Sequence, residues 1–188
     1  MKKTSKLVAF GVAALLGLSL SGCAASNNTA GDDNMGGMDH GSNHSMSITD
    51  KQSFAEAMIP HHQQAVDMSA LAETNTSNPG ILAIASKITS EQGPEIEKMT
   101  PWLEGKSVDS TMMMDGMISP IQLAALRTAE GATFDKLYVQ YMIEHHEGAV
   151  IMAADALGVD DAELTDFANE IIVVQSEEIE ELMALLNN

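Results

Sequence analysis

Apolar side chains recur every three or four residues from Thr49 almost to the end of the chain, which is the spacing of one face of an α-helix. Residues that start and stop helices divide this region into separate elements. The sequence predicts helices at about residues 50–74, 78–104, 119–131, 133–157 and 160–188. No segment alternates apolar and polar side chains as a strand does, so we predict an all-α fold.

Short capping signals indicate where these helices begin and end. Asn78 precedes a proline and is a favourable N-cap for the second helix. Thr133 is expected to cap the long helix that ends near Gly158. Asp160, followed three residues later by Glu163, resembles a capping box for the last helix.

The long helices contain an internal repeat. Residues 58–68 match residues 142–152 at an offset of 84, and each copy begins with methionine, isoleucine, a variable residue and two histidines. Their partner segments, residues 85–97 and 168–180, match at an offset of 83. Two copies of one helical hairpin predict a four-helix bundle.

The side chains that face the predicted core are apolar except near the middle of each helix. Counting residues from the two hairpin turns places the polar groups at one level, because antiparallel helices rise equally per residue. These groups are His61, His62, Gln92, Glu95, His145, His146, Gln175 and Glu178. Burying them is unfavourable unless each is hydrogen-bonded or binds a metal ion.

Histidine and methionine occur together in this pattern. Met58 lies three residues before His61, and Met142 lies three residues before His145, so each thioether shares a helix face with an imidazole. Imidazole and thioether without thiolate favour copper, and thioether favours Cu(I). The predicted metal ligands are His61, His62, His145, His146, Met58, Met68, Met142 and Met152.

Amide and carboxylate groups at the same level are expected to orient the imidazoles from behind. They are Gln92, Glu95, Gln175 and Glu178. Because each hairpin supplies imidazole and thioether, we expect two equivalent half-sites, with one site across the bundle axis as the alternative. A histidine–glutamate network that only fixes helix register would also explain the polar residues, and the core methionines would then be packing residues.

The first residues have the features of an export signal. Three lysines precede an apolar run from Leu7 to Leu20, which is too short for a stable membrane span. The residues up to Cys23 match a bacterial lipobox, so we predict a signal peptide at 1–22, lipidation of Cys23 and anchoring of the exported protein to a membrane. The mature chain then has no disulfide and no thiolate ligand.

Residues 23–48 are rich in Gly, Asn, Ser and Asp, so we predict a flexible tether, followed by the bundle domain at 49–188. Methionines and histidines in the tether, and methionines in the loop before residue 119, lie outside the predicted core and suggest secondary copper sites. These residues are Met35, Met38, His40, His44, Met46, Met112, Met113, Met114 and Met117.

The chain has a formal net charge of −18, and removal of the signal peptide leaves six basic and 27 acidic residues, a net charge of −21. Such a surface repels nucleic acid and attracts cations. Acidity also keeps an exported protein soluble. The charge therefore argues against nucleic acid as a partner but does not identify a metal ion.

The doubled Met-Ile-x-His-His motif, at residues 58–62 and 142–146, resembles the domain-of-unknown-function 305 family, as does the Gln-x-x-Glu-Ile segment at 92–96. The resemblance covers about residues 49–186 and implies a ferritin-like helical bundle. Several family members look like extracytoplasmic copper-binding or copper-tolerance proteins, so the resemblance implies a similar role here.

A ferritin-like bundle also suggests a rival function, a di-metal oxidase of Cu(I) or Fe(II). Di-iron bundles use Glu-x-x-His motifs, but methionine or isoleucine stands three residues before each of the four central histidines. We therefore expect a binding protein and not an enzyme. The oxidase and a metal-free envelope scaffold are the alternatives, and the sequence leaves the oligomeric state open.

Overall fold

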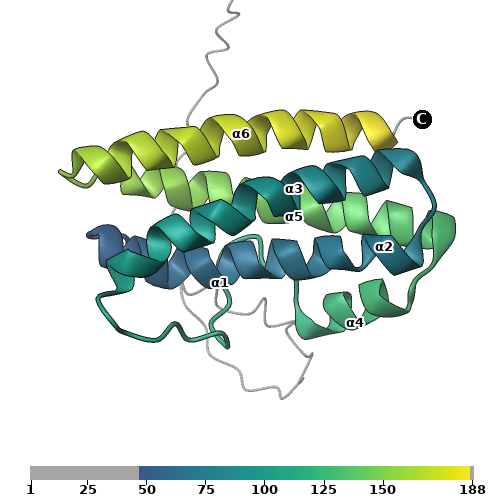
Figure 1. Cartoon of the computed structure of the whole chain (residues 1–188), viewed down its shortest axis with the longest axis horizontal. Helices are drawn as coiled ribbons and strands as arrows, with labels where there is room; N and C mark the ends of the chain where they lie inside the picture. The colour runs from purple at the N-terminus through teal and green to yellow at the C-terminus, as the bar shows by residue number, and fades with distance from the viewer. Residues whose placement is uncertain (1–46, 187–188) are drawn as a thin grey trace, which may run out of the picture. The chain divides into compact units, whose positions relative to one another are not determined.

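The computed structural model describes residues 47–186, and this part of the chain consists of helices and loops without a strand, as predicted (Figure 1). The elements are α1 (Lys51–Ala70), α2 (Ala72–Asn75), α3 (Pro79–Met99), the 3-10 helix η1 (Thr100–Leu103), α4 (Pro120–Thr128), α5 (Gly131–Ala156) and α6 (Ala162–Leu186). Between residues 47 and 186, no helix is both long and apolar enough to cross a membrane.

Side-chain caps define the ends of the first hairpin. Asp50 accepts a hydrogen bond from the backbone N–H of Ser53 and forms a capping box at the start of α1. Asn78 caps α3 by accepting a hydrogen bond from the N–H of Gly80, as predicted. The first predicted helix is interrupted at Leu71, which separates α1 from α2.

Two predicted caps in the second hairpin are wrong. α5 begins at Gly131, before Thr133. Gly131 follows the extended Glu130 and adopts a left-handed φ of 53°, a conformation that favours glycine. At the start of α6, the carboxylate of Asp161, and not that of Asp160, accepts a hydrogen bond from a first-turn N–H.

Two helical hairpins make up the bundle (Figure 1). α1 packs against α3 in the first, α5 packs against α6 in the second, and the hairpins meet through α1 with α5 and α3 with α6. The short α4 contacts α5. The Nδ2 atom of Asn75, at the end of α2, donates a hydrogen bond of 2.9 Å to the carbonyl of Ala129, just after α4.

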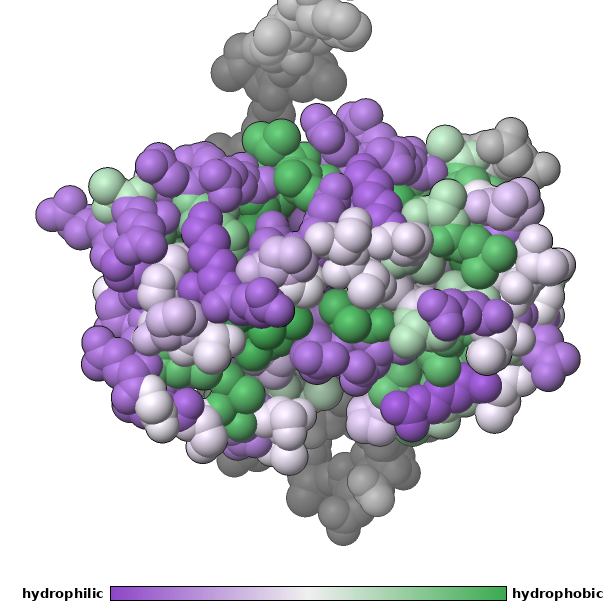
Figure 2. All heavy atoms as spheres, viewed as in Figure 1, coloured by the Kyte–Doolittle hydropathy of each residue, from purple (hydrophilic) through white to green (hydrophobic). Residues whose placement is uncertain are grey.

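Two apolar clusters fill the core, one on each side of a polar middle. Phe54 and Phe167 belong to the first cluster, and Phe134 and Leu182 belong to the second. We call the buried polar residues between them the central layer. It consists of His61, His62, Gln92, His145, His146, Gln175 and Glu178, each at most 1 % exposed, with the partly buried Glu91 and Glu95 at its edge. On the face drawn in Figure 2, hydrophilic side chains predominate and apolar ones are scattered.

Candidate metal centre

The two hairpins meet at a pair of imidazoles in close contact. The ring centroids of His61 on α1 and His145 on α5 lie 3.8 Å apart, with 36° between the ring planes, and both side chains are fully buried. Burial holds the pKa of both rings well below the usual 6.5, and a neighbouring histidine adds to each shift. Both rings are therefore neutral at pH 7, which is the form that binds metal ions.

Each hairpin also contains a histidine–glutamate pair. Nε2 of His62 lies 2.9 Å from a carboxylate oxygen of Glu95, and Nε2 of His146 lies 2.9 Å from a carboxylate oxygen of Glu178. A neutral ring that donates from Nε2 keeps Nδ1 as its acceptor. Burial, reinforced by the nearby His62, lowers the pKa of His146 to about 3. Both glutamates thus lie where they can orient an imidazole.

A third carboxyl group, Glu91 on α3, joins the central layer from its edge. It lies close to Glu178, whose negative charge disfavours ionisation of Glu91. Burial is the main cause that raises the pKa of each of these groups to about 7. The internal repeat did not reveal Glu91, because the equivalent position of the second hairpin is Val174.

Several polar atoms of the central layer have no hydrogen-bond partner within residues 47–186. Both amide atoms of Gln92 and of Gln175 are unpaired, and so is Nδ1 of all four histidines. Neither ring nitrogen of His145 makes a well-formed hydrogen bond, and the backbone of His61 is only a marginal partner. A buried polar group without a partner destabilises a fold by about 1–3 kcal/mol. The layer is therefore chemically suited to a ligand.

The loop before α4 crosses this site, and we call its residues 112–118 the strap. The backbone carbonyl of Asp115 accepts a hydrogen bond of 3.0 Å from Nε2 of His61. Further along, the backbone N–H and carbonyl of Ile118 bond to the side chain of Gln64 at 2.8 and 3.1 Å. The methionine-rich loop that was predicted as a separate secondary site therefore contacts the histidine pair.

The buried methionines divide between the two sides of the central layer. Met58, Met99 and Met152 lie in one apolar cluster together with Met114 of the strap, whereas Met68 and Met142 lie in the other. All six side chains are buried. Four thioethers are thus gathered on one side of the histidine pair and two on the other.

The remaining predicted ligands are less enclosed or lie outside the described residues. In the strap, the sulfur of Met117 accepts a hydrogen bond of 3.4 Å from the N–H of Met114, Met112 is partly buried, and Met113 is exposed. The predicted signal peptide and the residues of the tether with candidate chemistry fall outside residues 47–186. They are Cys23, Met35, Met38, His40, His44 and Met46.

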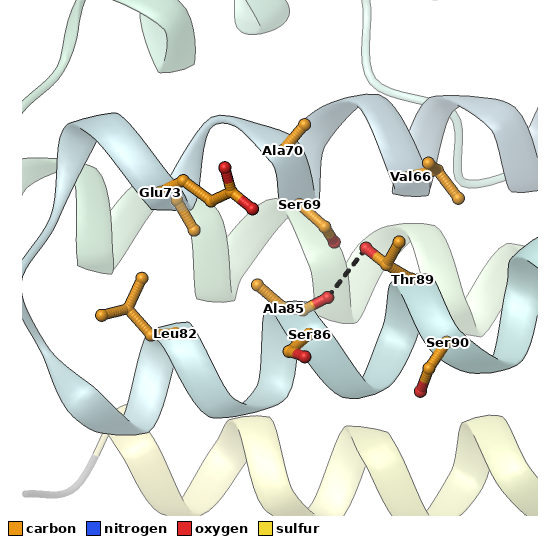
Figure 3. A pocket seen from close by; sticks show the side chains of 10 residues that line it. Val66, Ser69, Ala70, Glu73, Leu82, Ala85, Ser86, Thr89 and Ser90 are labelled. Atoms are coloured by element: carbon orange, nitrogen blue, oxygen red, sulfur yellow. Dashed lines mark hydrogen bonds between the residues drawn. The ribbon is translucent and has the colours of Figure 1, made fainter.

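Within residues 47–186, no group of three or more His, Cys, Asp or Glu side chains is arranged to hold a metal ion. A metal ion bound at the central layer would therefore need a donor of another type, and thioether sulfur is a soft one. The histidine pair is also separate from the surface pocket in Figure 3. That pocket, of about 500 Å³ between α1 and α3, is lined mainly by serine and alanine and contains no histidine or methionine.

Residues 51–186 match the family model described as Domain of unknown function (DUF305). The chain belongs to this family. The prediction from the doubled histidine motif is thereby confirmed, and with it the helical fold. No curated protein matches the chain.

Solved structures of the family share this fold. A member from Streptomyces coelicolor, described as a candidate secreted protein, has a TM-score of 0.67 at 28% identity, over 73% of this chain and 92% of that one. CopM in its Cu(I)-bound form has a TM-score of 0.63 at 33% identity, over 74% and 96%. Further structures show CopM with Cu(II), with Ag and in the apo form. A fragment from Deinococcus radiodurans has a TM-score of 0.66 at 26% identity, over 73% and 95%.

Proposed function

We propose that this chain is an exported, lipid-anchored protein that binds copper in its central layer. The observation that carries the proposal is the buried pair of neutral imidazoles, His61 and His145, among polar atoms that lack partners. CopM, a family member with the same fold and 33% identity, has Cu(I)-bound and Cu(II)-bound forms.

One shared site fits this geometry better than two half-sites, because His61 and His145 belong to different hairpins and their rings are in contact. Three of the four buried methionines on one side of the layer, Met58, Met152 and Met114, are the thioether candidates. Thioether sulfur stabilises Cu(I) more than Cu(II). We therefore propose Cu(I) as the preferred ion.

Titration of the apo-protein with Cu(I) and Cu(II) against a competing chelator tests this function. His61→Ala and His145→Ala are each expected to remove most of the binding, and the double change should add little, because both rings serve one ion. Additive losses would instead support two half-sites. Gln63→Ala, at an exposed position of α1, is the control. Copper binding that survives substitution of all four central histidines, in a protein without residues 23–48, would contradict histidine ligation.

Export and anchoring are proposed from the lipobox that ends at Cys23. The family member described as a candidate secreted protein supports export. In cell fractionation, Cys23→Ser should release the protein from the membrane or leave its precursor uncleaved. Normal membrane retention of this variant would contradict lipidation.

We propose binding without catalysis. The central carboxylates, Glu91, Glu95 and Glu178, lie on α3 and α6, and none of them forms a Glu-x-x-His motif with a histidine. Oxygen uptake in the presence of excess Cu(I) or Fe(II) should stay at the background rate. Sustained, protein-dependent uptake would support the oxidase instead.

A further inference from the structure

The two hairpins differ at one repeat position that touches the strap. Gln64 on α1 corresponds to Gly148 on α5 at the offset of 84. Both positions lie three residues after the paired histidines, His61 and His145. The two halves of the histidine site therefore present different groups to the segment that crosses it.

On α1, the side chain of Gln64 holds the strap by two hydrogen bonds. Its Oε1 accepts from the backbone N–H of Ile118 at 2.8 Å, and its Nε2 donates to the carbonyl of the same residue at 3.1 Å. The neighbouring Gln63 shows that this is specific, because its amide bonds only to the exposed Asp67, one turn along α1.

On α5, the close approach of the strap requires that residue 148 has no side chain. A Cβ atom on Gly148 would overlap the carbonyl group of Asp115 and lie 2.6 Å from Cα of Gly116. The contact is reciprocal, because a Cβ on Gly116, whose φ is +79°, would lie 2.6 Å from the carbonyl oxygen of Glu144. Backbone on both sides cannot move as a flexible side chain does, so only glycine permits this approach.

We propose that Gln64 and Gly148 are positioning residues that seat the strap on the histidine pair, and that the seated strap gives the site its preference for Cu(I). This inference rests on the proposed copper function. Between the two fixed points, the carbonyl of Asp115 bonds to His61. Just before it, Met114 enters the apolar cluster that contains Met58 and Met152.

The seated strap makes the two histidines non-equivalent. Nε2 of His61 is used by Asp115, so this ring offers a metal ion only Nδ1. His145 has neither nitrogen in a well-formed hydrogen bond. Imidazole serves both oxidation states of copper, whereas the thioethers that the strap brings serve Cu(I). Displacing the strap should therefore weaken Cu(I) binding much more than Cu(II) binding.

The test compares Cu(I) and Cu(II) dissociation constants of the full-length protein and its variants. Gly148→Ala should weaken Cu(I) binding about tenfold or more, equivalent to about 1.4 kcal/mol, and change Cu(II) binding much less. Gly93→Ala is the matched control, because an added Cβ there has no atom within 4 Å. It should leave both constants unchanged.

Gln64→Ala provides a milder second variant in case Gly148→Ala does not fold, and Gln63→Ala is its control. Gln64→Ala should shift the ring signals of His61 in the NMR spectrum of the apo-protein and lower the Cu(I) to Cu(II) preference. An unchanged preference in folded Gln64→Ala would overturn the inference and leave the proposed function intact. Absence of copper binding by the parent protein would overturn both.

Discussion

Burial, and not the presence of four histidines alone, sets the chemistry of the central residues. A solvated histidine with a pKa near 6.5 loses metal to protons as the pH falls through that value. His61 and His145 have pKa values well below this, because the protein interior disfavours a charged ring. They stay ready to bind at pH values where surface histidines are protonated.

We therefore predict that copper binding at the central layer persists at pH 5. Chelator competition between pH 7.5 and 4.5 would measure this, in a protein with His40→Ala and His44→Ala to remove the tether histidines. Affinity that falls tenfold per pH unit below 6.5 would show that the binding rings are solvated.

A second prediction concerns the neighbouring carboxyl groups of Glu91 and Glu178. Their pKa values are raised to about 7, so protonation of these groups contributes stability that is fully present below pH 4.5 and is lost as the pH rises through about 7. The lowered pKa of His146, about 3, acts in the opposite sense: its contribution is present above pH 6.5 and is lost as the pH falls towards 3.

The apo-protein should therefore be most stable between about pH 5 and 7. Glu178→Gln keeps an oxygen that can accept from His146 but needs no proton, so it should remove the loss of stability above pH 6. Thermal unfolding from pH 5 to 8.5 measures this. Glu170→Gln, which alters an exposed carboxylate paired with Lys98, is the control and should keep the alkaline decline.

At the scale of the helices, the position of the short α4 depends on hydrogen bonds from Asn75 at the end of α2. The side chain of Asn75 reaches three carbonyls at the end of α4, with the hydrogen bond to Ala129 the shortest at 2.9 Å. Asn75→Ala should lower the unfolding free energy by about 1–3 kcal/mol, because those carbonyls lose their donor. Denaturant unfolding measures the change. Asn169→Ala, which removes one exposed bond within α6, should change stability much less.

The elements that could be predicted from sequence are those with a repeated signal. Periodicity predicted the long helices, and equal rise from the two turns predicted that His61 and Glu95 share a level with His145 and Glu178. The contact of the strap with His61 could not be predicted, because it uses a backbone carbonyl and leaves no pattern in side-chain types. The prediction that Thr133 caps α5 was wrong, because the helix begins at the left-handed Gly131, which has no side chain that could indicate a cap in the sequence.

At the scale of the whole molecule, the apo-bundle contains a buried layer with unpaired polar atoms between two apolar clusters. An ion that binds only the folded state stabilises it by mass action, by about 2.7 kcal/mol at a free concentration 100 times the dissociation constant. Cu(I) should therefore raise the melting temperature, with calorimetry as the measurement. The His61→Ala and His145→Ala double variant should show no rise, and an equal rise in that variant would place the bound ion elsewhere.

Charge is also unevenly distributed over the molecule. No lysine or arginine follows Lys136, so α6 and most of α5 carry acidic residues alone. The field of this hairpin attracts cations over a range set by ionic strength. The first hairpin, with Lys51, Lys87 and Lys98 in ion pairs, is closer to neutral.

The difference between Gln64 and Gly148 has a consequence for how such a centre can be assembled. A homodimer of one hairpin about a two-fold axis must place the same residue at both positions. With glutamine at both, no backbone could approach α5 as closely as Asp115 does, and with glycine at both, nothing would hold Ile118. A centre with glutamine on one side and glycine on the other therefore requires both hairpins in one chain, because only then can one repeat change its sequence without the other.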